Sequence, residues 1–363
     1  MQKKLIALAI AAAFSAPAMA DVTMYGIIDA AVARVSQTAK KTDTLAVSGG
    51  LSGSRLGVKG AEDLDNGMKA VVVLEYSLDT QQADALVAAR QEMLAVAGGF
   101  GTVATGYLQT TGYDFAVKFD PTAGSSVSPL QNMTKGNASY LIGTVATAAR
   151  APRALAYISP DLGGVTVAVN YATTINPATG NLTVAETGAN SKTSATLLSA
   201  TYTGVANLVV GVVHASTSGT SSASAVTAYN NTDIALGASY DLGVAKLMGT
   251  YQTAKNSAVG TAGNSNKLMS FSAVAPVGPG AVVVTYAKAT IGATTVAGAN
   301  ENGSGYTLAY LQGMSKTVTA YGALSKVTNG SGTNKFSVGN NLVPGGANGS
   351  SSTMIAVGLK KVF

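Results

Sequence analysis

The chain ends on the stretch TMIAVGLKKVF, residues 353–363. Every second residue back from the terminus is large and mostly apolar, and the residues between them are smaller and more mixed. The larger set is Phe363, Lys361, Leu359, Val357 and Ile355. Since side chains alternate between the two faces of a strand, this pattern predicts a β-strand with one apolar face. A strand that ends the chain on an aromatic residue suits a closed sheet, in which the last strand pairs with the first and leaves no free edge.

The composition narrows the class of protein. Charged residues make up only 11% of the 363 residues, hydrophobic residues make up 47%, and there is no Cys. A soluble enzyme of this length usually has about a quarter of its residues charged, and a disordered chain is less apolar. Beyond the first residues no apolar run is long enough for a transmembrane helix. In lipid only helices and closed barrels satisfy their backbone hydrogen bonds, so the sequence predicts a β-barrel.

The first twenty residues, MQKKLIALAIAAAFSAPAMA, have the three parts of a secretory signal peptide. Lys3 and Lys4 precede a short apolar run, and Ala18-Met19-Ala20 forms a small-x-small cleavage site. We therefore predict a signal peptide at residues 1–20 and a transmembrane barrel domain at residues 21–363. Without its two lysines the formal charge falls from +6 to +4, and no run of Lys and Arg suggests a nucleic-acid partner.

Short turns and long loops alternate along the rest of the chain. Tight Gly-, Asp- and Asn-rich turns, typical of hairpins, are predicted at 62–67, 97–101, 160–164, 204, 241–243, 277–280 and 312–315. Longer polar segments are predicted at 37–50, 79–85, 110–148, 174–192, 217–228, 255–266, 291–303 and 328–351. Seven turns pair fourteen strands, and the first and last strands bring the count to sixteen. An even number of antiparallel strands with this alternation is typical of bacterial outer-membrane barrels.

Several blocks of the sequence resemble one family. They are DVTMYGIIDA near the start, SGSRLGVKGAEDLDNGMKAVVVLE, RQEMLAVAGGFGTVATGY, LAYISPDLGGVTVAVNY, DIALGASYDLGVAKLMGTY and the terminal AVGLKKVF. They resemble the general porins of Gram-negative bacteria, of the Neisseria and Burkholderia type. The resemblance implies a homotrimer of sixteen-stranded antiparallel barrels in the cell outer membrane. It also implies that the long third loop, at about residues 110–140, folds into each lumen and narrows it.

The sequence departs from the family pattern at the pore wall. Gly106-Tyr107 stands where the family usually has Gly-Arg, Arg150 and Arg153 stand in an altered block, and Lys361 replaces a terminal histidine. These departures leave the expected fold unchanged, but they bear on ion selectivity and conductance.

Alternation and the resemblance together predict the residues of a pore constriction. Inward parity selects Arg55, Lys59, Lys69 and Glu75, and it places Arg90 and Glu92 on one face. Arg150 faces inward if Leu155 and Tyr157 face lipid, whereas Arg153 then has the opposite parity unless Pro152 marks a bulge. The predicted basic wall comprises Arg55, Lys59, Arg90 and Arg150. The predicted opposing side comprises Asp114, Lys118 and Asp120 of the third loop, together with Glu92.

The leading hypothesis is a general diffusion porin for ions and small hydrophilic solutes, with a weak anion preference. Its expected surroundings are outer-membrane lipid and lipopolysaccharide, and no metal or cofactor is expected. A second hypothesis is a sugar-selective channel, because Tyr107, Tyr113 and Phe115 lie near the third loop. A third hypothesis is a structural or adhesive barrel whose lumen is closed. An enzyme is disfavoured, since the single histidine, His214, has no serine or carboxylate set in register with it.

Overall fold

The computed structural model of the chain describes residues 21–38, 42–82, 86–135, 140–144, 146–173, 192–221, 227–256, 265–292, 299–339 and 346–363. The predicted signal peptide at residues 1–20 lies outside the described residues. The first strands are β1 (Asp21–Gln37), β2 (Asp43–Ser48), β3 (Arg55–Asp63), β4 (Lys69–Leu78), β5 (Leu86–Gly98) and β6 (Gly101–Gln109). Helical segments are η1 (Asp65–Gly67), α2 (Thr111–Phe119), α3 (Pro129–Lys135) and α4 (Ala146–Ala149).

Eleven further strands complete the described chain. They are β7 (Arg150–Ile158), β8 (Val165–Thr173), β9 (Lys192–Tyr202), β10 (Leu208–Ser221), β11 (Thr227–Asp241), β12 (Lys246–Asn256), β13 (Ser265–Val277), β14 (Gly280–Thr290), β15 (Gly303–Gly313), β16 (Val318–Asn329) and β17 (Ser351–Val362). Each of the seven predicted short turns joins two consecutive strands, from β3–β4 to β15–β16. None of the helices in the described ranges is long and apolar enough to cross a membrane.

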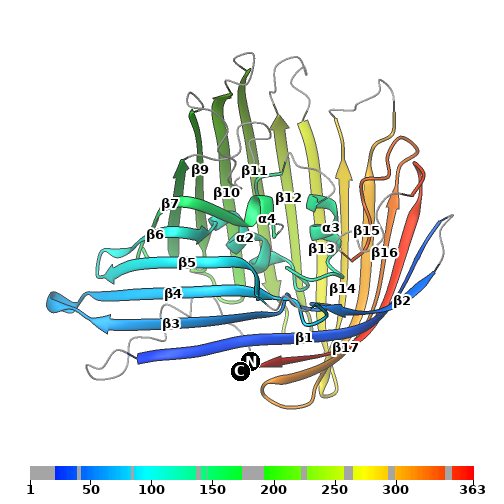
Figure 1. The fold of residues 1–363 in the computed structure, drawn as a ribbon, viewed down its shortest axis with the longest axis horizontal. Coiled ribbons are helices and arrows are strands. Elements are labelled where there is room, and N and C mark those ends of the chain that lie inside the picture. The colour runs from blue at the N-terminus through cyan, green and yellow to red at the C-terminus, as the bar shows by residue number, and fades with distance from the viewer. Residues whose placement is uncertain are drawn as a thin grey trace.

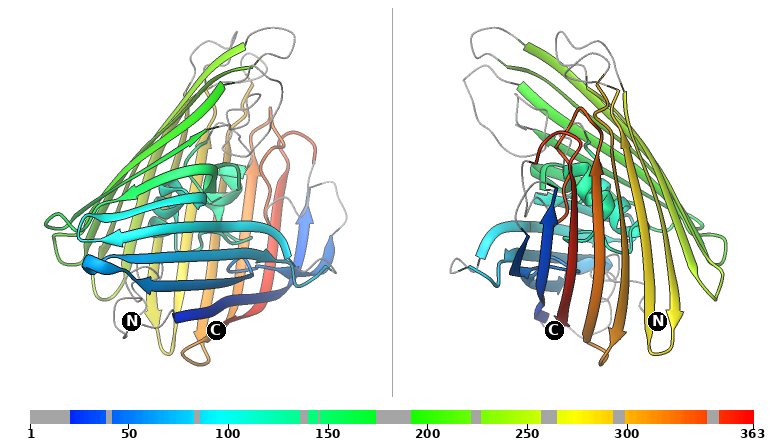
Figure 2. Two further views of the ribbon diagram at one scale, coloured as in Figure 1. Left: turned by 60° about the vertical axis from the view of Figure 1, so that its left-hand side comes forward. Right: turned by 90° about the vertical axis from the view of Figure 1, so that its right-hand side faces the viewer.

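The strands form one antiparallel sheet that closes on itself (Figure 1). β1 pairs with β17 from Ile27 opposite Val362 to Gln37 opposite Ser352, and the two strands lie side by side in Figure 2. Backbone hydrogen bonds between Gly26 and Phe363 extend the pairing to the last residue. The prediction that the terminal strand closes the barrel on the first is therefore confirmed.

Seventeen strand segments occupy sixteen positions around the barrel. β2 pairs with the second half of β1 and β3 pairs with its first half, so together they fill one position. The prediction of a continuous loop at 37–50 was wrong in this detail, because Asp43–Ser48 forms a strand. Asp29 holds the break between β2 and β3, where its carboxylate accepts hydrogen bonds from the backbone N–H groups of Leu51 and Ser52.

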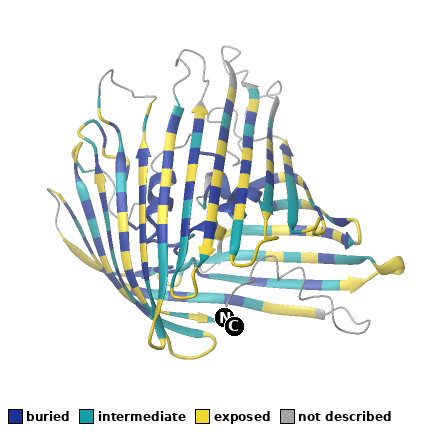
Figure 3. Ribbon diagram, turned by 180° about the vertical axis from the view of Figure 1, so that it is seen from behind, coloured by how far each residue is buried: buried dark blue, intermediate teal, exposed yellow. Residues whose placement is uncertain are grey.

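Period-two alternation runs along the strands, as the bands of buried and exposed residues in Figure 3 show. In β1, Val22, Met24 and Val32 are exposed on the outer face, while Asp29 and Ala33 are completely buried on the inner face. In β17, Ile355, Val357 and Leu359 are likewise exposed, and Met354 and Ala356 are buried. Large apolar residues therefore cover the outer face, which suits contact with lipid.

The segment between β6 and β7 lies inside the barrel, as predicted for the third loop (Figures 1 and 2). Its helix α2 packs against β9 and β10, and α3 packs against β14 and β15. Phe115 and Phe119 of α2 lie with ring centroids 4.9 Å apart over Gly211 and Gly237, which are paired across β10 and β11. A Cβ on Gly237 would come within 2.5 Å of the Phe119 ring, so glycine is what lets the rings reach the wall.

Polar side chains of the wall hold the backbone of this loop. Asn170 Oδ1 on β8 accepts a hydrogen bond from Thr111 N at 2.7 Å. Asp233 Oδ2 on β11 accepts from Leu141 N at 2.9 Å, and Thr307 Oγ1 on β15 donates to the Val127 carbonyl at 2.6 Å. Because buried polar groups require partners, these contacts fix the loop against β8–β15. Less of the loop is attached on the β3–β5 side, where the predicted basic residues lie.

Candidate pore constriction

Three neighbouring strands bring Arg55, Glu75 and Arg90 together on the inner wall. Arg90 Nε lies 2.7 Å from Glu75 Oε1, and Arg55 Nε lies 4.0 Å from Glu75 Oε2. The hydroxyl of Tyr25 on β1 donates to Glu75 Oε2 at 3.0 Å. One carboxylate thus holds two guanidinium groups at the lumen, and the pair of arginines keeps a surplus of positive charge.

A β-bulge in β5 decides which way its charged residues point. Glu75 is opposite Gln91 while Tyr76 is opposite Ala89, so Arg90 is the extra residue and turns inward. Glu92 keeps the outward parity of Leu94, is exposed, and accepts a hydrogen bond from the Tyr76 hydroxyl at 2.8 Å. The prediction that placed Glu92 in the lumen with Arg90 was wrong, because simple alternation does not survive a bulge.

Arg150 joins this cluster from the end of the third loop. Its guanidinium carbon lies 4.4 Å from the centroid of the Tyr113 ring, a cation–π geometry. Its side chain also donates to the backbone carbonyls of Arg90 and Ala149. The structure therefore brings Arg55, Arg90 and Arg150 to one place. Arg153 is exposed at a register shift between β6 and β7 and stays outside the cluster.

Tyr113 is the residue of the third loop that meets the arginines. Arg90 Nη2 donates to its hydroxyl at 3.4 Å. Burial raises the pKa of the Tyr113 phenol, but the charges of Arg90 and Arg150 outweigh burial and hold that pKa below its ordinary value. The sequence marked Tyr113 only as an aromatic residue near the loop, and no spacing rule connects it to the arginines.

Two lysines extend the positive wall. Lys59 Nζ lies 5.9 Å from the centroid of the Tyr25 ring. Lys360 shares the inward parity of Met354 and Ala356, lies opposite Asp29 in the β1–β17 register, and interacts electrostatically with Asp29 and Arg55. Lys360 was missed at the level of sequence, although the alternation of residues 353–363 contains the signal: it belongs to the smaller, inward set.

The charged residues of the third loop divide between two roles. Asp114 accepts a hydrogen bond from Gln109 Nε2 at 2.5 Å, and burial raises the pKa of its carboxyl despite Gln109, Lys118 and Arg150 nearby. Lys118 is exposed and donates to Thr201 Oγ1 on β9 at 3.3 Å. Asp114 is half-buried, whereas Lys118 is open to solvent.

Asp120 has a structural position instead. It is buried, and its carboxylate accepts from Thr122 N at 2.8 Å, from Thr122 Oγ1 at 2.7 Å and from Ser128 Oγ at 2.6 Å. These bonds tie the turn that follows α2 to the start of α3. The prediction that Asp120 opposes the arginine wall was therefore wrong, because the loop uses this carboxylate to fold itself.

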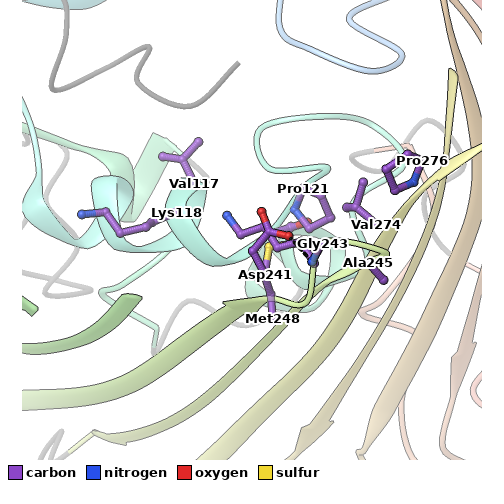
Figure 4. A pocket seen from close by; sticks show the side chains of 11 residues that line it. Val117, Lys118, Pro121, Asp241, Gly243, Ala245, Met248, Val274 and Pro276 are labelled. Carbon is purple, nitrogen blue, oxygen red and sulfur yellow. Dashed lines mark hydrogen bonds between the residues drawn. The ribbon is translucent and has the colours of Figure 1, made fainter. Parts of the chain in front are cut away.

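A cavity of 390 Å³ lies under α2, at the end of the barrel that carries the short turns (Figure 4). Its lining includes Lys118 and Pro121 from the loop, and Lys246 and Met248 from β12. The cavity therefore lies between the third loop and the turn that joins β11 and β12. Across the residues that the structure describes, no group of three or more His, Asp or Glu side chains could hold a metal ion.

Comparison with known proteins gives a consistent result. The family profile described as Gram-negative porin matches residues 7–332. Outer membrane porin protein 32 of Delftia acidovorans is 29% identical over the full length of both chains. Major outer membrane protein P.IB of Neisseria lactamica is 32% identical over 47% of this chain and 50% of its own. The solved structure of an anion-selective porin from Comamonas acidovorans superposes with a TM-score of 0.79 and 26% identity, covering 95% of this chain and 100% of that one.

Proposed function

The chain belongs to the Gram-negative porins, and from that premise we propose that it is a general diffusion porin with a preference for anions. It is an outer-membrane barrel that lets small solutes pass passively, as its family and fold indicate. The observation that carries the anion preference is the gathering of Arg55, Arg90 and Arg150 around one wall carboxylate, Glu75. A ring of like charge in a narrow pore attracts ions of the opposite sign and repels its own.

The proposed constriction comprises Arg55, Lys59, Arg90, Arg150 and Lys360 on the wall, with Tyr113, Asp114 and Lys118 from the third loop. In this arrangement Glu75 orients the guanidinium groups and lowers the total charge by one. Tyr113 holds the loop at a fixed distance from the wall. The anion-selective relative from Comamonas acidovorans supports the same sign of selectivity.

The test is a planar-bilayer recording with purified mature protein. Single-channel steps are expected, and in a KCl gradient the reversal potential should take the sign of chloride permeation. Steps with a reversal potential of the opposite sign would support a porin but contradict the proposed anion preference. No steps from protein shown to be folded by its heat-modifiable gel mobility would favour a closed structural barrel.

A sugar-selective channel has less support. Such channels offer aromatic ring faces to the passing substrate, whereas Tyr113 and Phe115 are about 95% buried, between the arginines and against Gly237. We also infer no catalytic role. His214 lies on the outer face between Leu198 and Ile234 in the strand registers, away from the lumen. Replacing His214 should leave conductance unchanged.

We propose a homotrimer with its contact near β4 and β5. Glu92 and Tyr76 form a polar pair on the outer face, among the exposed apolar residues Leu74 and Leu94. A carboxylate facing lipid is costly, and a subunit contact would remove it from lipid. In seminative electrophoresis the wild type should migrate as a trimer, and Glu92→Arg should migrate as a monomer.

Export follows from the predicted signal peptide. We propose that residues 1–20 are removed on passage through the inner membrane, so that the mature chain begins at Asp21. β1 begins at the same residue, which leaves no overhang before the barrel. Intact-mass measurement of protein extracted from outer membranes should give the mass of residues 21–363.

A further inference from the structure

The outer face of β12–β14 carries a row of lysines at the ends from which the long loops emerge. Lys255, Lys267 and Lys288 share the outward parity of Tyr251, Met269 and Tyr286 on the same three strands, and all three lysines are exposed. Lys326 has the outward parity of β16 and lies opposite Tyr306. These four residues are called the lysine belt below.

The strand registers place the members of the belt close together. Lys267 is opposite Thr253, two residues from Lys255, and Lys288 is opposite Met269, two residues from Lys267. Diagonal neighbours of this kind lie about 7–8 Å apart, within reach of one another's long side chains. None of the four forms an ion pair with an acid of the described residues. Among the described residues the belt is therefore a concentrated positive patch with no paired acid.

An apolar surface lies directly below the belt. Met269, Phe271, Val284, Tyr286 and Leu308 are between 41% and 57% exposed on the outer face of β13–β15. Cations above such a surface match an amphiphile whose acyl chains lie along the barrel and whose anionic groups lie at the boundary with water. The corresponding positions of β10 and β11 carry Ser216, Ser218 and Thr232, so the feature belongs to one side of the barrel.

We propose that the lysine belt binds the phosphate groups of lipopolysaccharide in the outer leaflet. This rests on the proposed function, since it takes the long loops to face outward. β12–β14 lie across the barrel from β4 and β5, the proposed subunit contact, so Lys255, Lys267 and Lys288 face lipid in the assembly. Lipopolysaccharide carries more than one phosphate per molecule, and a row of several lysines on adjacent strands suits such a polyanion better than a single-phosphate lipid.

Two double variants test the proposal with matched charge. K267Q/K288Q removes two cations from the belt. K316Q/K361Q removes two from the opposite end of the outer surface, where Lys361 Nζ donates to Thr317 Oγ1 in the turn between β15 and β16. Binding is measured for the full mature chain in detergent with three probes: diphosphorylated lipid A, the same lipid A stripped of phosphate, and phosphatidylglycerol.

The expected result is a loss of affinity for diphosphorylated lipid A of roughly 25-fold in K267Q/K288Q, about fivefold for each lysine. K316Q/K361Q and wild type should bind alike, and dephosphorylated lipid A should bind weakly to all. Equal affinities of both variants, or equal losses, would overturn the proposal. Equal binding of phosphatidylglycerol would overturn the assignment to lipopolysaccharide. Single-channel conductance is recorded in parallel and should be unchanged, so a failure of the belt and a failure of the porin function remain distinguishable.

Discussion

The inner wall at β3–β5 and the inner wall at β10–β11 follow the same period-two pattern but serve opposite purposes. At β3–β5 the inward residues are long and charged, and Arg55, Glu75 and Arg90 are partly exposed. At β10–β11 the inward residues are small or are covered by the third loop, which packs on Gly211, Gly237 and Asp233. The barrel wall is therefore divided into a stretch that faces the solute and a stretch that seats the loop. Alternation alone identifies an inward residue but not which of these two roles it has.

The largest expected effect comes from removing the Asp233 carboxylate, which binds the backbone of the third loop. Asp233 is completely buried, and its Oδ2 accepts hydrogen bonds from Leu141 N, Ile142 N and Gln252 Nε2. Asp233→Ala would leave these buried donors without a hydrogen-bond acceptor and destabilise the protein by about 3 kcal/mol or more. We expect a lower thermal midpoint at a fixed scan rate and noisier conductance. Asp233→Asn keeps an acceptor and should lose less than half as much. If Asp233→Ala had the thermal midpoint and the low current noise of the wild type, the β10–β11 wall would not be what holds the third loop.

The next effect tests the aromatic contact of the same wall. Gly237→Ala places a Cβ 2.5 Å from Phe119 Cδ2 and 2.9 Å from Phe115 Cζ, and such overpacking costs about 1–3 kcal/mol. Gly322→Ala on β16 is the matched control, because a Cβ there meets nothing within 4 Å. Thermal midpoints should fall for the first variant and stay at the wild-type value for the second. Equal midpoints would mean that α2 does not need a flat wall.

The sequence predicts the features of this architecture that depend on local patterns, and it fails at those that depend on how distant residues pair. Strand positions, short turns and the closing pair of β1 and β17 follow from period two and turn chemistry, which are local signals. The inward set that includes Arg55, Lys59 and Glu75 follows from the same period. The prediction failed at Glu92, because the bulge at Arg90 arises from pairing with β4, which no local pattern encodes. It failed at Asp120 because the loop's internal hydrogen bonds depend on how residues 120–128 fold together.

A third prediction addresses the charged wall with two substitutions of opposite sign. Arg55→Gln removes a cation and should lower the chloride-to-potassium permeability ratio, whereas Glu75→Gln removes the anion and should raise it. Each change is expected to be fivefold at most, because a unit charge acting over about 4 Å of water contributes about 1 kcal/mol. Reversal potentials in a KCl gradient measure both. Shifts of the same sign, or a shift in Asp233→Asn as large as that in Glu75→Gln, would contradict the division between the walls.

The smallest expected effect concerns Asp114, which lies where the loop approaches the charged wall. Burial raises the pKa of its carboxyl, and Gln109, Lys118 and Arg150 offset this only in part. As pH falls below neutral, Asp114 therefore takes up a proton before an exposed aspartate would. The pore then loses one negative charge, and its anion preference should rise by roughly twofold or less, because salt screens charges over a Debye length of about 10 Å.

Reversal potentials recorded in one KCl gradient between pH 7 and pH 5 measure this effect, and Asp114→Asn supplies the control. The variant carries no charge at this position at either pH, so its selectivity at pH 7 should already equal that of the acidified wild type and should change little on acidification. An identical pH profile in both proteins would assign the titration to another carboxylate. The control therefore also tests whether the loop, as well as the wall, sets the charge of the constriction.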